Sequence, residues 1–172
     1  MPEERTGLVT FKGNPLTLVG PALKVGTAAP AFTLVGNDLQ PVALADTAGK
    51  IRLVTVVPSL DTPVCDTMAR RFNQQAAELP DDVVVYTVSV DLPFAQARWC
   101  GNAGIERVKT LSDYQERAFG LDYGLLIKEL KLLARAVLVI DRNGTLKYFQ
   151  LVREVVEEPD YQAAIDAVNQ LL

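Results

Sequence analysis

The chain has 172 residues, of which 49% are hydrophobic and 22% are charged. This is enough to bury one hydrophobic core and is typical of a globular protein. Seventeen Lys and Arg residues against 21 Asp and Glu residues give a net charge of -4, so we expect neither a nucleic-acid partner nor a membrane-binding patch. No basic segment followed by an apolar stretch opens the sequence, and no run approaches the roughly 18 apolar residues of a membrane span. We therefore expect one soluble, cytoplasmic domain over residues 1–172.

The first elements are extended. Residues 8–11 and 16–19 flank the turn residues 12–15, which predicts a hairpin. Two further extended segments follow at 32–35 and 41–44.

The next stretch alternates buried strands with helices. Residues 51–57 form a nearly continuous β-branched run, which is typical of a strand buried on both faces. Apolar residues at spacings of three and four predict a helix over Pro63–Leu79. A second buried strand is predicted over 83–90, and a short helix over 93–101, with Gly101 as its C-cap.

The last third predicts a hairpin and a closing helix. In chain order, the predicted elements are a short strand at 108–111, a short helix at 113–119, a buried strand at 136–140, a tight turn at 141–144 into a strand at 145–152, and a helix over 161–172 with Ile165, Val168 and Leu172 on its inward face. The whole pattern predicts an α/β fold with a mixed central sheet between helices.

The chain contains no histidine, which excludes Ser-His-Asp hydrolysis, Cys-His proteolysis and His-containing metal sites. Its two cysteines, Cys65 and Cys100, cannot complete a tetrahedral zinc site or hold an iron–sulfur cluster, and a reducing cytosol disfavours a permanent disulfide. We expect no cofactor and no metal. The thiols either perform redox chemistry or are small buried hydrophobic residues.

Thr62-Pro63-Val64-Cys65 has the features of a helix start. Thr62 is a favoured N-cap, and Pro63 suits the first helical position, where its missing N–H costs nothing. Cys65 then stands at the third helical position, where first-turn amides and the helix dipole favour a thiolate. The neighbouring Asp66 opposes that effect.

Pro58, Thr62 and Cys65 have the spacing Pro-x-x-x-Thr-x-x-Cys, which resembles the peroxiredoxin active-site motif. Longer strings resemble the thiol peroxidase subfamily, an atypical two-cysteine group. They are Phe11-Lys12-Gly13-Asn14-Pro15, Pro58 to Cys65, Asp91 to Gly101, Ala134-Arg135-Ala136-Val137 and Glu158-Pro159-Asp160-Tyr161. The resemblance runs from about Leu8 to the C-terminus and implies a thioredoxin-like fold. It has one departure, because Lys131 stands where the family usually has glycine.

The resemblance implies a role for each matching residue. Cys65 is expected to be the peroxidatic cysteine, which attacks a peroxide oxygen and becomes a sulfenic acid. Thr62 is expected to hydrogen-bond the thiolate and the peroxide, Arg135 to hold the developing negative charge, and Pro58 to cover the pocket. The alternatives are a plain N-cap for Thr62 and a surface or salt-bridged arginine for Arg135.

Cys100 is expected to be the resolving cysteine, which forms an intramolecular disulfide with Cys65 that thioredoxin reopens. The alternative is a buried apolar cysteine beside Trp99. The family's members are usually homodimers, which is the expectation here.

The most favoured function is therefore a thioredoxin-dependent peroxidase acting on hydrogen peroxide and organic hydroperoxides. A peroxide sensor that uses the same disulfide remains open, as does a non-catalytic binding module of thioredoxin-like fold. The coexistence of Pro58, Thr62, Cys65 and Arg135 weighs against the binding module. A disulfide reductase is disfavoured because the chain has no Cys-x-x-Cys.

Overall fold

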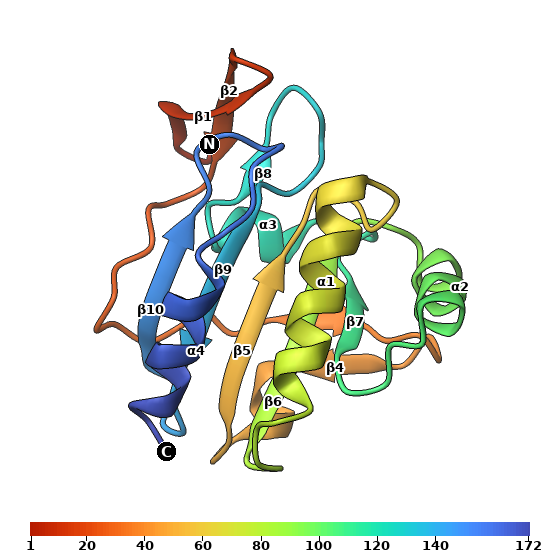
Figure 1. The fold of residues 1–172 in the computed structure, drawn as a ribbon. Helices are drawn as coiled ribbons and strands as arrows, with labels where there is room; N and C mark the ends of the chain where they lie inside the picture. Colours follow the sequence, from red (N-terminus) through yellow and green to blue (C-terminus); the bar gives the residue numbers. More distant parts are fainter.

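A seven-stranded mixed sheet forms the centre of the protein in a computed structural model that describes residues 1–172 (Figure 1). Its strands, in spatial order, are β10 (Leu146–Leu151), β9 (Ala136–Ile140), β5 (Ile51–Val56), β6 (Val83–Ser89), β7 (Lys109–Ser112), β3 (Thr33–Val35) and β4 (Pro41–Ala43). The middle strands β5, β6 and β7 are parallel to one another, and antiparallel strands flank them on both sides. This arrangement confirms the predicted mixed sheet.

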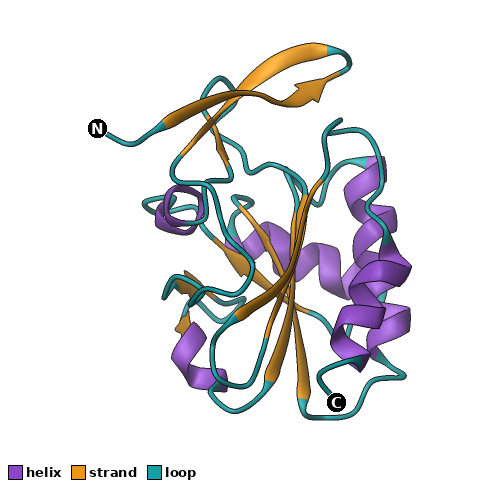
Figure 2. Cartoon of the chain, turned by 90° about the vertical axis from the view of Figure 1, so that its left-hand side faces the viewer, coloured by secondary structure: helices purple, strands orange, loops and turns teal.

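Helices cover both faces of this sheet (Figure 2). Helices α1 (Pro63–Ala76) and α4 (Tyr161–Asn169) share one apolar cluster with one face of the sheet, and α2 (Pro93–Ala103) joins the edge of that cluster. The opposite face packs against α3 (Ala118–Asp122) and a three-stranded sheet of β1 (Glu4–Phe11), β2 (Asn14–Val19) and β8 (Leu126–Ile127). A short 3₁₀ helix, Leu44–Thr47, follows β4.

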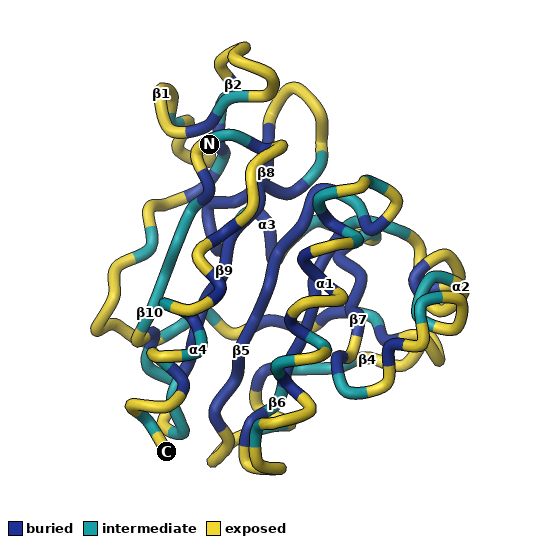
Figure 3. Tube along the Cα trace, in the orientation of Figure 1, coloured by how far each residue is buried: buried dark blue, intermediate teal, exposed yellow.

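Strand β5 shows why the central strands have mostly apolar sequences. Ile51 and Leu53 contribute to the cluster under α1 and α4, whereas Val54 and Val56 contribute to the cluster on the opposite face. Since successive side chains of a strand point to opposite faces, both sets must be apolar when both faces are covered. Figure 3 shows β5 and its neighbours as the buried centre of the molecule.

Some predicted helix ends were wrong. Helix α2 continues through Gly101 to Ala103, and Gly104, at φ 66°, takes the left-handed conformation that ends the helix. Helix α3 begins at Ala118, five residues later than predicted, and the carboxylate of Asp113 accepts hydrogen bonds from amides of its first turn.

The terminal helices differ in smaller ways. Helix α1 ends at Ala76 and not at residue 79, because the chain tightens there into a turn. The buried residues of α4 are Tyr161, Ala164 and Val168, whereas Leu172, predicted to face inward, is 53% exposed. Strand β8 has two residues, too few to show the alternation of a strand, and it was not predicted.

The β1–β2 hairpin is fastened to a segment near the C-terminal end of the chain. Backbone hydrogen bonds join Thr10 to Arg153 at 2.8 Å and Val155 to Thr10 at 2.9 Å. The carboxylate of Glu154 also accepts a hydrogen bond from the amide of Gly13 at 2.8 Å. The hairpin therefore supports residues 153–155 from outside the central sheet.

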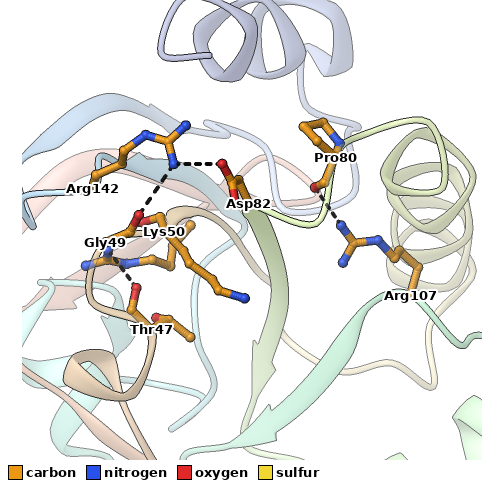
Figure 4. A network of polar contacts seen from close by, with 8 residues as sticks. Thr47, Gly49, Lys50, Pro80, Asp82, Arg107 and Arg142 are labelled. Carbon is orange, nitrogen blue, oxygen red and sulfur yellow. Dashed lines mark hydrogen bonds and ion pairs between the residues drawn. The ribbon is translucent and has the colours of Figure 1, made fainter.

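Further polar contacts fasten the turns at the amino ends of β5 and β6 (Figure 4). Arg142 donates to the carbonyl of Gly49 at 3.4 Å and pairs with Asp82 at 3.3 Å. Arg107 donates to the carbonyl of Pro80 at 3.1 Å. These contacts lie at the opposite end of the strands from the start of α1.

None of the helices is both long enough and apolar enough to cross a bilayer.

Candidate active site

Helix α1 begins beyond the carboxyl end of β5 with the predicted cap. Thr62 has an extended backbone, and its Oγ1 accepts a hydrogen bond from the amide of Cys65 at 3.3 Å. Pro63 occupies the first helical position. Cys65 is consequently the third helical residue, where the positive end of the helix dipole favours a negative charge.

The thiol of Cys65 is buried at the end of the apolar cluster between α1 and the sheet, with 0% of the residue exposed. Pro58, which is also buried, follows β5 by two residues. The hydroxyl of Thr62 donates to the carbonyl of Ser59 at 3.1 Å, and no hydrogen bond joins it to the sulfur of Cys65. The hydroxyl proton of Thr62 is therefore engaged by Ser59.

Arg135 directly precedes β9, the strand beside β5, and its side chain reaches α1. It precedes Ala136, which pairs with Val56 at the carboxyl end of β5. Its guanidinium donates from Nε to the carbonyl of Val155 at 2.9 Å and from Nη1 to the sulfur of Met68 at 3.6 Å. Since Met68 lies three residues after Cys65, the guanidinium contacts the turn of α1 that follows the thiol.

Arg135 is 1% exposed, yet no carboxylate lies within ion-pair distance of it. The nearby Glu158 instead accepts a hydrogen bond from Tyr161 at 2.8 Å. Burial raises the pKa of Tyr161, so its phenol keeps the proton that it donates. A buried cation without a paired carboxylate is costly, and it suits a site that binds or forms an anion.

Cys100 lies on α2 and faces a different element. Its Sγ is 3.4 Å from Oγ1 of Thr110 on β7, and the Thr110 hydroxyl donates to Asn37 at 2.9 Å. Both cysteines are free thiols. The structure thus places Thr62 and Cys65 together at the start of α1, with buried Pro58 in the loop before it and Arg135 against Met68 in the next turn, while Cys100 remains on a separate helix directed at β7.

Asp91 is a site feature that the sequence analysis did not assign. Its carboxylate accepts hydrogen bonds from the Ser59 hydroxyl at 2.7 Å, the Leu60 amide at 2.8 Å and the Ser89 hydroxyl at 2.7 Å. It therefore ties the loop before Cys65 to the end of β6. An aspartate directly after a buried strand, two residues before a predicted helix-starting proline, was the available signal.

A cavity of about 510 Å³ lies between this loop and α2. It is lined by Ser59, Leu60, Asp61, Asp91, Leu92, Phe94, Ala95, Arg98, Trp99 and Asn102. None of the five predicted site residues lines it, so it lies beside the Cys65 site and is not the Cys65 site itself.

Several known proteins are similar to this chain in sequence and in fold. The redoxin family profile matches residues 24–165. A thiol peroxidase of Halalkalibacterium halodurans is 56% identical over 95% of this chain and 98% of its own length, and one of Bacillus subtilis is 52% identical with the same coverage. The chain belongs to the thiol peroxidases of the redoxin family. The fold agrees, because a peroxiredoxin-like protein from Aquifex aeolicus superposes with a TM-score of 0.91, at 44% identity over 98% of both chains.

The one departure from the thiol peroxidase pattern has a visible backbone consequence. Lys131 has φ 57°, in the left-handed region that favours glycine. Its amide donates to the carbonyl of Ile127 at 2.8 Å, and its carbonyl accepts from Arg117 at 3.1 Å. The turn before Arg135 therefore keeps a glycine-like conformation, although a lysine occupies it.

Proposed function

We propose that this member of the thiol peroxidases is a peroxidase that reduces hydrogen peroxide and organic hydroperoxides through Cys65. The observation that carries the proposal is the buried guanidinium of Arg135, which has no carboxylate partner and contacts the turn of α1 that follows Cys65. A thiolate at the third helical position and the charge that develops on peroxide are the anions that such a cation would stabilise.

In the first step, the thiolate of Cys65 attacks one peroxide oxygen and the O–O bond breaks. That oxygen stays on sulfur as a sulfenic acid. The other oxygen leaves with the electron pair, takes a proton and becomes water or an alcohol. Arg135 holds the negative charge during this transfer, Thr62 orients the peroxide once its hydroxyl leaves Ser59, and buried Pro58 limits the access of water.

In the second step, the thiol of Cys100 condenses with the sulfenic acid. A sulfur–sulfur bond forms, the sulfur–oxygen bond breaks, and the hydroxyl leaves with the thiol proton as water. A dithiol such as thioredoxin then supplies two electrons and two protons by thiol–disulfide exchange. The proposal includes a single domain, a homodimer and a cytoplasmic location, in which this reductant is present.

The test compares Cys65→Ser and Cys100→Ser with the wild type. Cys65→Ser should consume no peroxide, whereas Cys100→Ser should form one sulfenic acid per chain but turn over poorly with thioredoxin. Equal single-turnover reactivity in the two variants would overturn the assignment of Cys65.

The same assay separates a peroxidase from a peroxide sensor. A peroxidase consumes many equivalents of peroxide when a small amount of thioredoxin is kept reduced. A sensor stops after one oxidation.

A further inference from the structure

The residue that follows Cys65 and the residue that precedes Cys100 are hydrogen-bonded to each other. Nε1 of Trp99 on α2 donates to Oδ1 of Asp66 on α1 at 2.8 Å. The other oxygen of Asp66 accepts from Nε of Arg70 at 2.8 Å, one turn along α1. The carboxylate therefore has both oxygens engaged, one within its own helix and one across to α2.

Arg70 adds two further contacts between the helices. Its Nη1 donates to the carbonyl of Ala103 at 3.3 Å, and its guanidinium carbon lies 5.9 Å from the centroid of the Trp99 ring. We call Asp66, Arg70 and Trp99 the interhelix latch. It attaches the last turn of α2 to the first two turns of α1.

The rest of α2 is held mainly through its first half. Pro93 and Gln96 are its only buried residues, and Gln96 donates to the Ser89 hydroxyl at 3.0 Å and the Leu111 carbonyl at 2.9 Å. From Ala97 to Ala103 no residue of α2 is fully buried, and only Trp99, Cys100 and Ala103 pack partly against the apolar cluster. A segment with so little burial opens at small cost, and the latch adds polar contacts to these partial apolar ones in keeping it in place.

The latch also determines where Cys100 points. Successive residues of a helix are about 100° apart around its axis, so while Trp99 faces Asp66 the next side chain is turned away from that contact. The sulfur of Cys100 accordingly contacts Thr110 on β7. A disulfide requires Cα atoms within about 7 Å and side chains directed at each other. Helix α2 must therefore turn or unwind at Trp99 before Cys100 can reach Cys65.

We infer that Trp99, held by Asp66, is a positioning residue that delays the resolving step. The inference rests on the proposed function. The step is the condensation described above, in which Cys65 loses its sulfenic hydroxyl as water and gains the bond to Cys100. Breaking the Trp99–Asp66 hydrogen bond precedes it, so the strength of the latch determines how long the sulfenic acid of Cys65 survives.

The principal test is Trp99→Phe, which keeps an aromatic ring but removes the N–H donor together with the second ring of the indole. The reduced protein is mixed with one equivalent of hydrogen peroxide and quenched with acid at intervals, and disulfide is measured by mass spectrometry. We expect disulfide formation about fivefold to tenfold faster than in the wild type, the effect of losing one partly exposed hydrogen bond to a charged group. Sulfenic acid formation, measured in a Cys100→Ser background, should stay within about twofold of the wild type because Trp99 makes no hydrogen bond to Cys65, Thr62 or Arg135.

The matched control is Tyr148→Phe, which removes one aromatic donor from β10, where the phenol contacts Gln150 at 3.5 Å. This control should leave both rates unchanged.

A second measurement needs no peroxide. In a Cys65→Ser background, the rate at which iodoacetamide alkylates Cys100 should rise about fivefold to tenfold with Trp99→Phe and not with Tyr148→Phe. Asp66→Ala keeps Trp99, the only tryptophan of the chain, and its fluorescence should move to longer wavelength as the indole leaves α1. Asp82→Ala, which removes an ion pair at the opposite end of the sheet, should not change the emission.

The outcomes separate this inference from the proposed function. If wild-type protein forms no disulfide with peroxide, the proposed function fails and the inference fails with it. If the wild type forms the disulfide but Trp99→Phe forms it at the same rate or more slowly, only the inference is overturned. Faster alkylation accompanied by a matching loss of global stability would also overturn it, because the effect would then be general unfolding.

Discussion

Arg135 combines burial with directional contacts that a lysine cannot reproduce. One nitrogen of its planar guanidinium donates a hydrogen bond to the carbonyl of Val155, and another donates to the sulfur of Met68. The ammonium group of a lysine is a single point charge and cannot donate to both of these widely separated acceptors.

Arg135→Lys should therefore slow the reaction with peroxide by about 10²- to 10³-fold, the usual cost of losing one well-aimed donor to a charged transition state. The measurement is the second-order rate constant of sulfenic acid formation, while reduction of a preformed disulfide by thioredoxin should be unaffected. Arg142→Lys, at the opposite end of the sheet, is the control. A rate constant for Arg135→Lys within about threefold of the wild type would show that Arg135 is structural.

Lys131 is the residue where backbone strain predicts a change in stability. It is exposed and has φ 57°, a conformation that costs about 1–2 kcal/mol for a residue with a Cβ, while glycine adds an entropic cost of about 0.5–1 kcal/mol. Lys131→Gly should thus raise the free energy of unfolding by about 0.5–1 kcal/mol in urea titrations. Lys109→Gly, at an exposed position that opens β7, should lower it by a similar amount. A loss of stability in both variants would contradict the strain argument.

At the scale of elements, the proposed disulfide requires α2 to move. Its second half has no buried residue, and Cys100 contacts β7 in the reduced protein. Oxidation to the Cys65–Cys100 disulfide should therefore speed amide exchange over residues 93–103 and around Cys65 by at least about tenfold, while β5 amides stay protected. Hydrogen-exchange mass spectrometry of reduced and oxidised samples measures this. Equal exchange in the two states would mean that the disulfide forms without local unfolding.

The elements also show which parts of the fold a sequence can predict. Strands β5, β6 and β9 were predicted because both their faces are covered, which makes most of each run apolar. The end of α2 was not predicted correctly. Two glycines, Gly101 and Gly104, follow Cys100, and only tertiary structure decides that Gly104 takes the left-handed conformation that ends the helix. The start of α3 depends on Asp113, a carboxylate that lies outside the helix.

The same distinction holds for the candidate site. Thr62, Pro63 and Cys65 form a local helix start, and their geometry follows from four consecutive residues. Contacts between distant segments leave no local pattern. Asp91 reaches Ser59 across 32 residues and Trp99 reaches Asp66 across 33, so neither link was foreseen.

At the scale of the whole molecule, the β1–β2 hairpin is coupled to pH through Glu154. Hydrogen bonds from the amides of Gly13 and Val156 lower the pKa of Glu154 below its ordinary value. A lowered pKa means that the carboxylate stabilises the docked hairpin above the pKa of an unfolded glutamate, and that this contribution is lost as the pH falls through the folded value.

The amide of Gly13, followed by nuclear magnetic resonance, should therefore lose protection as the pH falls below the usual glutamate range. Glu154→Gln should weaken that protection already at neutral pH and remove its acid dependence. Glu157→Gln is the control, because the Glu157 side chain makes no hydrogen bond. An identical pH profile for wild type and Glu154→Gln would refute the coupling.

The position of the hairpin decides which end of the chain is suited to attachment. Residues 24–165, the part shared with the family profile, contain every proposed site residue but not β1 or β2. A protein trimmed to those limits would lose the strand that holds Arg153 and Val155, and Val155 is the residue whose carbonyl fixes Arg135. The C-terminus lies at the other end of the molecule, and Leu172 is 53% exposed (Figure 1). An electrode, a bead or a fluorescent fusion joined at Leu172 would leave the hairpin undisturbed and the start of α1 facing the solution.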